Sequence, residues 1–231
     1  MLPDYEEFRS RADAVRARIA AACALARRRL EEVELLAVTK SHPVAAVEMA
    51  ARYGLKAVGE NRVQEGIDKR AQSAAAVAWE LIGHLQSNKA RLAARNFDRI
   101  QSVDSAKLLE ILDGEAAALG RTQAVLLQVN AGLDPAKSGV EPDEAPRLLA
   151  AALGRKNIRV EGLMTVAPLT GGPDAARRAF ARLREIRDSL AAASGARLPE
   201  LSMGMSGDLD AAVAEGSTLV RVGTDLFGAR A

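Results

Sequence analysis

The sequence VELLAVTKSHPVAAVEMAARYGLKAV, residues 33–58, begins with an apolar run at 33–39 and ends with a second run at 56–58. Between them, apolar residues recur at helical spacing over 44–53. Short apolar runs rich in leucine and β-branched residues are typical of buried strands, so this stretch predicts a strand, a helix and a second strand. Parallel strands need such a crossover helix between them.

The same alternation continues along the rest of the chain. Six further strand-like runs lie at Ala78–Ile82, Arg99–Val103, Ala124–Asn130, Val160–Val166, Glu200–Met203 and Leu219–Val222. Further segments with helical spacing lie at Ala106–Leu119, Pro142–Leu153 and Pro173–Ala193. Eight strand and helix units in about 200 residues fit a closed (β/α)₈ barrel, an α/β fold of the TIM type. A doubly wound open sheet is the alternative, although it usually has fewer strands.

A long helix is expected before the barrel. Apolar residues from Phe8 to Leu25 are spaced by three and four positions, which marks one face of a helix over residues 4–29. No linker rich in proline, glycine or serine divides the chain. We therefore expect one domain over residues 1–231, with the helix at 4–29 and the barrel at 33–228.

Composition excludes several classes of function. The net charge is +2 and aromatic residues make up 3% of the chain, which disfavours nucleic acid as a partner. Cys23 is the only cysteine, so a disulfide within the chain and a cysteine-built metal site are excluded. The two histidines lack metal-ligand spacing, so we expect no metal; His42, beside Pro43, is expected in a solvent-facing loop. The longest apolar stretch, 19–26, is too short to span a bilayer, and the acidic start resembles no signal peptide, so a cytoplasmic protein is expected.

Lys40 is the first candidate for chemistry. In a barrel of this type the active site lies at the C-terminal ends of the strands, and Lys40 directly follows the first predicted strand. A lysine amine in such a place can condense with a carbonyl group to form a Schiff base. A lysine that simply leaves the strand for solvent is the alternative.

Two glycine-containing turns near the C-terminus are candidates for binding a phosphate. Residues 202–208 read SMGMSGD, and residues 221–224 read RVGT. Glycine flexibility, hydroxyl groups and free backbone N–H groups at a helix start suit a phosphate, and barrel phosphate sites usually form between strands seven and eight. Each turn alone could be an ordinary loop. The last strand of a closed barrel pairs with the first, so we also expect Arg221 to lie near Lys40.

Together these residues resemble the pyridoxal phosphate homeostasis proteins, relatives of the N-terminal barrel of alanine racemase. The resemblance runs through Leu36–Lys40, Gly59–Glu65, Ile82–Lys89, Lys137–Gly139, Gly162–Thr165, Leu201–Asp208 and Val220–Thr224. It covers nearly the whole chain and implies that pyridoxal 5′-phosphate (PLP) is bound.

The resemblance also implies roles for individual residues. Lys40 would form a covalent aldimine with PLP, and Arg221 would face the pyridine nitrogen. The Ser206 hydroxyl and the N–H groups of Gly223 and Thr224 would hold the phosphate. Two more residues in the family motifs are expected among the cofactor contacts, Asn61 and Met203. The motifs also place four residues near the mouth without assigning them a contact: Glu60, Gln64, His84 and Asn88.

The resemblance implies a PLP carrier without catalytic residues, which would buffer the cofactor and deliver it to apo PLP-dependent enzymes; we expect a monomer. An amino-acid racemase is one alternative, but it needs a second base, a tyrosine supplied by an extra domain. Tyr5 and Tyr53 lie in helical segments away from the strand ends, and the chain ends at Ala231, soon after the last strand. An arginine at the pyridine nitrogen also weakens the electron sink that racemisation needs. A Schiff-base aldolase that uses Lys40 without a cofactor is the third hypothesis.

Overall fold

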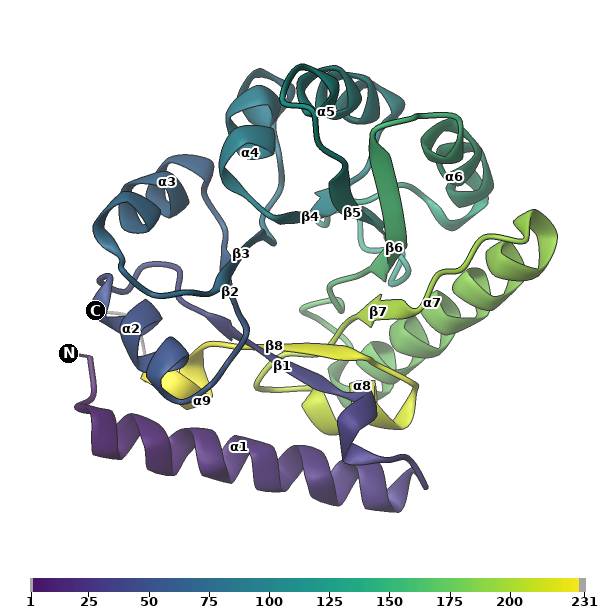
Figure 1. The fold of residues 1–231 in the computed structure, drawn as a ribbon. Coiled ribbons are helices and arrows are strands. Elements are labelled where there is room, and N and C mark those ends of the chain that lie inside the picture. Colours follow the sequence, from purple (N-terminus) through teal and green to yellow (C-terminus); the bar gives the residue numbers. More distant parts are fainter. Residues whose placement is uncertain (1, 229–231) are drawn as a thin grey trace.

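The computed structural model describes residues 2–228, and its eight strands close into a parallel barrel in sequence order (Figure 1). The strands are β1 Glu34–Val38, β2 Ala57–Glu60, β3 Ala78–Leu81, β4 Arg99–Val103, β5 Gln123–Gln128, β6 Ile158–Met164, β7 Glu200–Ser202 and β8 Leu219–Val222. Each predicted apolar run forms one of these strands, so the (β/α)₈ fold is confirmed and the doubly wound sheet is wrong. β8 pairs with β1 to close the barrel, with Arg221 opposite Leu36.

Helices surround the barrel (Figure 1). They are α1 Tyr5–Leu25, α2 Ala45–Arg52, α3 Val63–Gln72, α4 Ala90–Asn96, α5 Ala106–Ala118, α6 Ala145–Leu153, α7 Gly172–Ser194, α8 Leu209–Ala214 and α9 Thr224–Phe227. Short 3₁₀ turns lie at Leu30–Glu32, Ser87–Lys89 and Pro142–Glu144. Over the described part of the chain, none of these helices combines the length and apolar character needed to cross a membrane.

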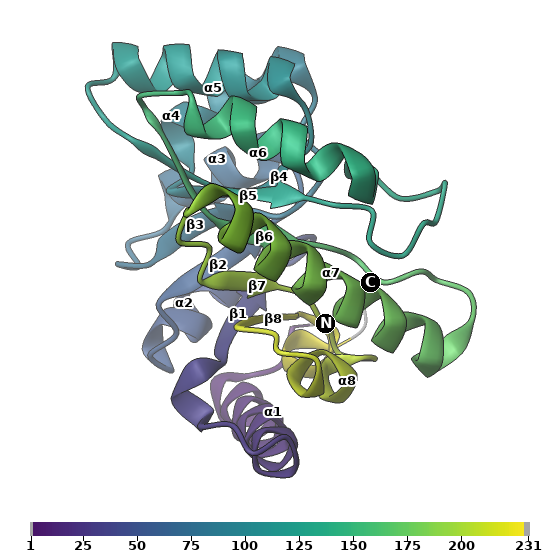
Figure 2. The same ribbon diagram turned by 90° about the vertical axis from the view of Figure 1, so that its right-hand side faces the viewer.

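The first helix, α1, packs against α8 and α9, on the side of the barrel where β8 pairs with β1 (Figures 1 and 2). Asp4 caps its N-terminus by accepting a hydrogen bond from the Glu7 N–H at 2.9 Å. Its buried face begins with Phe8, whose ring stacks on Phe227 of α9 with centroids 5.2 Å apart. The helix ends at Leu25, earlier than predicted, because Arg27 has a φ of 56°, a left-handed conformation that no helix continues.

Polar side chains share the inside of the barrel with a small apolar cluster of Leu36, Ala57 and Leu219, while the main apolar core lies between the strands and the helices. Ser202 of β7 hydrogen-bonds Gln101 of β4, although these two strands are not neighbours in the sheet. Arg99 of β4 likewise reaches Glu161 of β6, at 3.2 Å. Such contacts can form only across the interior. Part of the barrel interior is therefore polar, whereas layers of branched apolar residues usually fill this fold.

Gly162 of β6 lies close against the backbone of β7. A Cβ atom at this position would overlap the carbonyl group of Glu200 in β7. The register between β5 and β6 also shifts just before Gly162, which is typical of a β-bulge. Glycine is therefore required here by the approach of the next backbone.

We expect Gly162→Ala to lower the free energy of unfolding by about 1–3 kcal/mol or more, because the added methyl group has to displace a strand. Gly114 in α5 is the matched control, since a Cβ there meets nothing within 4 Å. Gly114→Ala should raise the free energy of unfolding by about 0.5–1 kcal/mol, through helix propensity. Urea unfolding of both variants gives the measurement, and equal effects would contradict the close approach.

Candidate functional site

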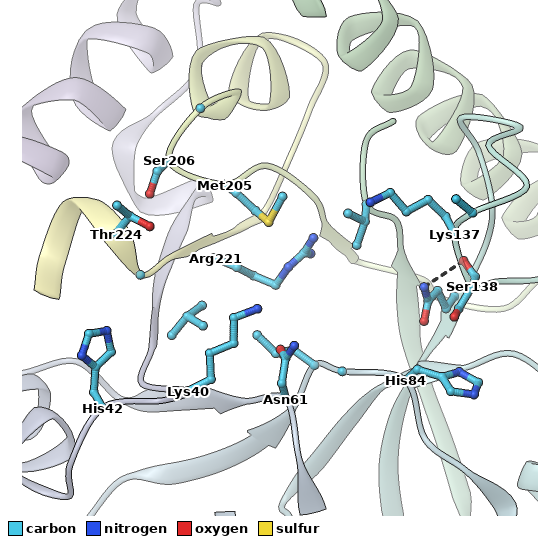
Figure 3. Close-up of a pocket in the computed structure, with 18 of the residues that line it drawn as sticks. Lys40, His42, Asn61, His84, Lys137, Ser138, Met205, Ser206, Arg221 and Thr224 are labelled. Carbon is cyan, nitrogen blue, oxygen red and sulfur yellow. Dashed lines mark hydrogen bonds between the residues drawn. The ribbon is translucent and has the colours of Figure 1, made fainter. Parts of the chain in front are cut away.

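A cavity of about 560 Å³ opens at the C-terminal ends of the strands (Figure 3). Its volume lies within the range of small-molecule sites. Six of the seven predicted cofactor residues line it: Lys40, Asn61, Ser206, Arg221, Gly223 and Thr224. They come from the ends of β1, β2, β7 and β8 and from the start of α9. Polar groups from several strand ends are thus brought together around one cavity.

Met203 does not belong to this ring. Its side chain is fully buried in the apolar core, and Met205, two residues further along the same turn, lines the cavity instead. The backbone at Gly204 has a φ of 95°, which redirects the chain between the two methionines. The contact of Met203 with the cofactor stays a prediction, and Met205 is the methionine that lines the cavity.

The four residues without an assigned contact fall in different places. His84 lines the cavity, and its Nδ1 lies 3.6 Å from Oδ2 of Asp104. Gln64 and Asn88 are exposed on α3 and on the turn before α4, outside the cavity lining. Glu60 is fully buried beneath the cavity.

His42 was expected in a solvent-facing loop; it lies in the turn after β1 and is half-buried. The residue lines the cavity, and its ring lies 5.2 Å from that of Phe227 in α9. The His42 N–H donates to the Thr39 carbonyl at 3.1 Å, so the chain turns tightly after β1. This turn folds the imidazole back over the barrel.

Lys40 follows β1, and its side chain points into the cavity on the same side as Arg221 (Figure 3). The pairing of β8 with β1, from which we predicted that the two residues lie near each other, is confirmed. Arg221 is 4% exposed and donates from Nη1 to Ser202 Oγ at 2.6 Å and from Nη2 to the Thr165 carbonyl at 2.8 Å. Its guanidinium is therefore held against the inner wall of the barrel.

A buried ion cluster lies below Lys40. We call Glu60 of β2 and Glu65 and Lys69 of α3 the Lys69 cluster. Lys69 Nζ donates to one carboxylate oxygen of each glutamate at 2.8 Å. Burial raises the pKa of Glu60, and the hydrogen bond from Lys69 opposes this shift. Burial also works against ionisation of Glu65, but its hydrogen bonds from Lys69 and from the Ser41 N–H keep its pKa below the ordinary value.

The Lys69 cluster holds the backbone on both sides of Lys40. On one side, Lys69 Nζ donates to the Thr39 carbonyl at 2.7 Å, and the Thr39 hydroxyl donates to Glu60 at 2.6 Å. On the other side, the Ser41 N–H donates to Glu65. Ser41 has a φ of 61°, so these contacts fix an unusual turn at this residue. The Lys40 side chain therefore extends from a backbone that is restrained at both neighbouring residues.

The two predicted phosphate turns lie side by side at one end of the cavity. The Ser206 hydroxyl accepts a hydrogen bond from the Asp225 N–H at 3.4 Å, which joins the turn after β7 to α9. Arg18 of α1 donates to the Ser206 carbonyl at 2.7 Å and supports this turn from outside. At Gly223 a Cβ atom would lie 3.1 Å from the Val38 carbonyl, so glycine lets the two strand ends approach.

Residues that we did not select from the sequence line the opposite end. Gln128, at the end of β5, donates from Nε2 to the Ser138 carbonyl at 2.9 Å. Its Oε1 is buried and has no hydrogen-bond partner among residues 2–228. Lys137 and Ser138 also line the cavity. Lys137 and Ser138 belong to a motif of the family resemblance, and this motif could have identified them. They lie in a loop beyond the strand end, so the search for polar residues at strand ends did not find them.

The donor set fits a phosphorylated aromatic aldehyde such as PLP. Hydroxyl and backbone N–H groups at one end suit a phosphate, and the Lys40 amine beside them suits an aldehyde. The guanidinium of Arg221 can donate to a ring nitrogen. These groups come from β1, β7, β8 and α9, so closure of the barrel assembles the site.

We expect Lys69→Met to lower the free energy of unfolding by about 3–5 kcal/mol, because it leaves the buried Glu60 carboxylate without its partner. A raised pKa means that the folded protein binds the proton more tightly than the unfolded chain. The loss of unfolding free energy in Lys69→Met should therefore be largest at neutral pH. It should shrink as the pH falls toward 4.5, the ordinary pKa of glutamate, because Glu60 then becomes protonated.

Urea unfolding at neutral pH and near pH 5 measures this difference. The control is Arg147→Met, which breaks an ion pair with Glu144 whose side chains are 86% and 59% exposed. Its effect should stay below about 1 kcal/mol at both pH values. A Lys69→Met deficit that did not depend on pH would contradict the role of Glu60.

Comparison with known proteins agrees with this geometry. The family described as alanine racemase, N-terminal domain, matches residues 11–231. A pyridoxal phosphate homeostasis protein of Pseudomonas aeruginosa is 43% identical over 217 residues, which cover 94% of this chain and 93% of the relative. Another, from Escherichia coli, is 37% identical over 226 residues, 94% of each chain.

Among solved structures, PipY of Synechococcus elongatus with PLP bound is 43% identical in sequence, with a TM-score of 0.81. The alignment covers 91% of this chain and all of that one. The resemblance stated from the motifs is thus confirmed over most of the sequence. The chain belongs to the pyridoxal phosphate homeostasis protein family, within the wider family of the alanine racemase N-terminal domain.

Proposed function

We propose that this protein binds PLP through a Schiff base at Lys40 and buffers the cofactor for delivery to apo PLP-dependent enzymes. The observation that carries the proposal is a single cavity in which Lys40, Arg221 and the turns at Ser206 and Gly223 come together. A family member with PLP bound supports the identity of the ligand. In this proposal the protein acts in the cytoplasm and as a monomer.

Each residue then has a distinct task. The Lys40 amine captures the aldehyde, while Ser206, Gly223 and Thr224 hold the phosphate and set the orientation of the ring. Asn61, which lines the same cavity, completes the contacts. Bound PLP supplies an electrophilic carbon and an electron-withdrawing ring. How strongly that ring withdraws electrons depends on the group that faces its nitrogen.

Arg221 favours a carrier over a racemase. Burial lowers the pKa of Arg221 to about 10, which still leaves the guanidinium protonated at neutral pH. A protonated guanidinium can only donate, so the ring nitrogen has to accept with its lone pair and stays unprotonated. A neutral ring stabilises a carbanion poorly, and racemisation requires that carbanion.

We expect Lys40→Ala to abolish the visible absorption band of the PLP-loaded protein and to leave the far-ultraviolet circular dichroism unchanged. Lys40 stands after β1 and lines the cavity, so its side chain is not needed for the core. Lys107→Ala, on the exposed face of α5, is the control and should keep the band. Borohydride reduction and peptide mapping should place the pyridoxyl group on Lys40, and a label on another lysine would overturn the assignment.

We also expect no racemase turnover on alanine. Each positioned acid or base typically contributes about 10²- to 10⁴-fold in rate, and this site offers Lys40 as the base on one face of the ring. The measurement is deuterium incorporation at Cα of L-alanine and D-alanine in deuterated buffer. Turnover on the order of 10 per second or more, as in a typical enzyme, would favour the racemase instead.

A further inference from the structure

A chain of hydrogen bonds runs through the barrel interior from Arg221 to the opposite end. Arg221 Nη1 donates to Ser202 Oγ at 2.6 Å, and Ser202 Oγ donates to Gln101 Oε1 at 2.6 Å. Gln101 Nε2 donates to Glu80 Oε2 at 2.5 Å. Arg99 then holds Glu80 with two hydrogen bonds, of 2.8 and 3.0 Å. We call Ser202, Gln101 and Glu80 the interior relay.

Every member of the interior relay is shielded from water. Ser202 and Gln101 are 0% exposed, and Glu80 is 5% exposed. A buried polar group is unfavourable unless it is hydrogen-bonded, and a buried charge is unfavourable unless an opposite charge compensates it. The relay meets both requirements. The neutral side chains of Ser202 and Gln101 are hydrogen-bonded on both sides, and the charged groups lie at the two ends, Arg221 at one and Glu80 with Arg99 at the other.

The direction of the hydrogen bonds is set from the Glu80 end. Burial raises the pKa of Glu80, and the Arg99 guanidinium opposes this shift and favours the ionised carboxylate. An ionised carboxylate only accepts, so Gln101 has to present its NH₂ group to Glu80 and its carbonyl oxygen to Ser202. The single hydroxyl proton of Ser202 then goes to Gln101. The Ser202 oxygen is left to accept from Arg221.

Arg221 depends on this arrangement because both of its hydrogen bonds go to uncharged oxygens, Ser202 Oγ and the Thr165 carbonyl. The negative charges that support the guanidinium are those of Asp208 and Glu80, and both oppose the effect of burial. Glu80 therefore acts on Arg221 in two ways, by its charge and by orienting the side chains between them.

We propose that Ser202, Gln101 and Glu80 are positioning residues that fix the Arg221 guanidinium on the wall of the cavity before any ligand binds. The identity of the ligand, and the ring nitrogen that Arg221 faces, rest on the proposed function. The restraint on Arg221 does not, because it concerns side chains of this chain alone. A preorganised guanidinium costs little to order on binding, which favours affinity.

The variant that tests the relay is Ser202→Ala, which removes the acceptor for Arg221 and the donor to Gln101. Ser102→Ala is the matched control, because Ser102 on β4 is also 0% exposed but its hydroxyl has no hydrogen-bond partner among residues 2–228. Ser202→Thr keeps the hydroxyl and should restore the wild-type behaviour. Gln101→Met provides a second break in the relay that leaves both direct partners of Arg221 in place.

Two measurements separate positioning from a purely structural role. In the protein without ligand, nitrogen NMR follows rotation of the Arg221 guanidinium, assigned by comparison with Arg221→Lys. We expect faster rotation in Ser202→Ala and Gln101→Met than in wild type, Ser102→Ala and Ser202→Thr.

The second measurement uses the PLP-loaded protein. The chemical shift of the labelled ring nitrogen should move toward the protonated form in Ser202→Ala and Gln101→Met. The Kd for PLP should rise about tenfold, as expected for one unmet buried hydrogen bond.

The possible results are distinguishable. If Ser202→Ala does not fold, Gln101→Met carries the same test. Rotation of Arg221 that matches Ser102→Ala in both relay variants would overturn the inference, as would an unchanged ring-nitrogen shift in both. If wild-type protein binds no PLP, the proposed function fails, while the NMR of the ligand-free protein still decides whether the relay restrains Arg221.

Discussion

The buried charge of Arg221 is the constraint on which much of this structure depends. The Arg221 guanidinium is only 4% exposed, so most of its hydrogen bonds and its counter-charges have to come from the interior. This explains why Ser202, Gln101, Glu80 and Arg99 lie inside the barrel, beside the small apolar cluster of Leu36, Ala57 and Leu219. The main hydrophobic core lies in the layer between the strands and the helices.

The cavity is supported in the same manner from two further directions. The Lys69 cluster restrains the backbone beside Lys40 from below, through buried carboxylates on β2 and α3. From outside the barrel, Arg18 of α1 pairs with Asp210 at 2.6 Å and donates to the Ser206 carbonyl, so the first helix stabilises the turn proposed to hold the phosphate. All three supports use charged side chains, which hold the turns around the cavity through hydrogen bonds and ion pairs.

Most of the fold and part of the site could be predicted because they depend on local pattern. Apolar runs gave the strands, and the residue at each strand end gave Lys40, Arg221 and the glycine turns. The interior relay could not be predicted, because Ser202 and Gln101 are 101 positions apart and meet only across a closed barrel. Lys69 was hidden for another reason, since a lysine on an amphipathic helix is expected to face solvent. The turns that bury Met203 and fold back His42 depend on backbone angles that the sequence pattern does not reveal.

The interior relay also bears on why position 221 holds a donor. Because Glu80 accepts from both Arg99 and Gln101, the hydrogen bonds through Gln101 and Ser202 all run in one direction, and the last oxygen accepts from Arg221. A carboxylate at position 221 would meet that oxygen with another acceptor and would add a second negative charge to the interior that already holds Glu80. A group that stabilises the barrel at this position is therefore one that donates, and on the proposed function such a donor leaves the cofactor nitrogen unprotonated. The polarity of the barrel interior and the weak electron sink expected of a carrier are then two consequences of the same arrangement.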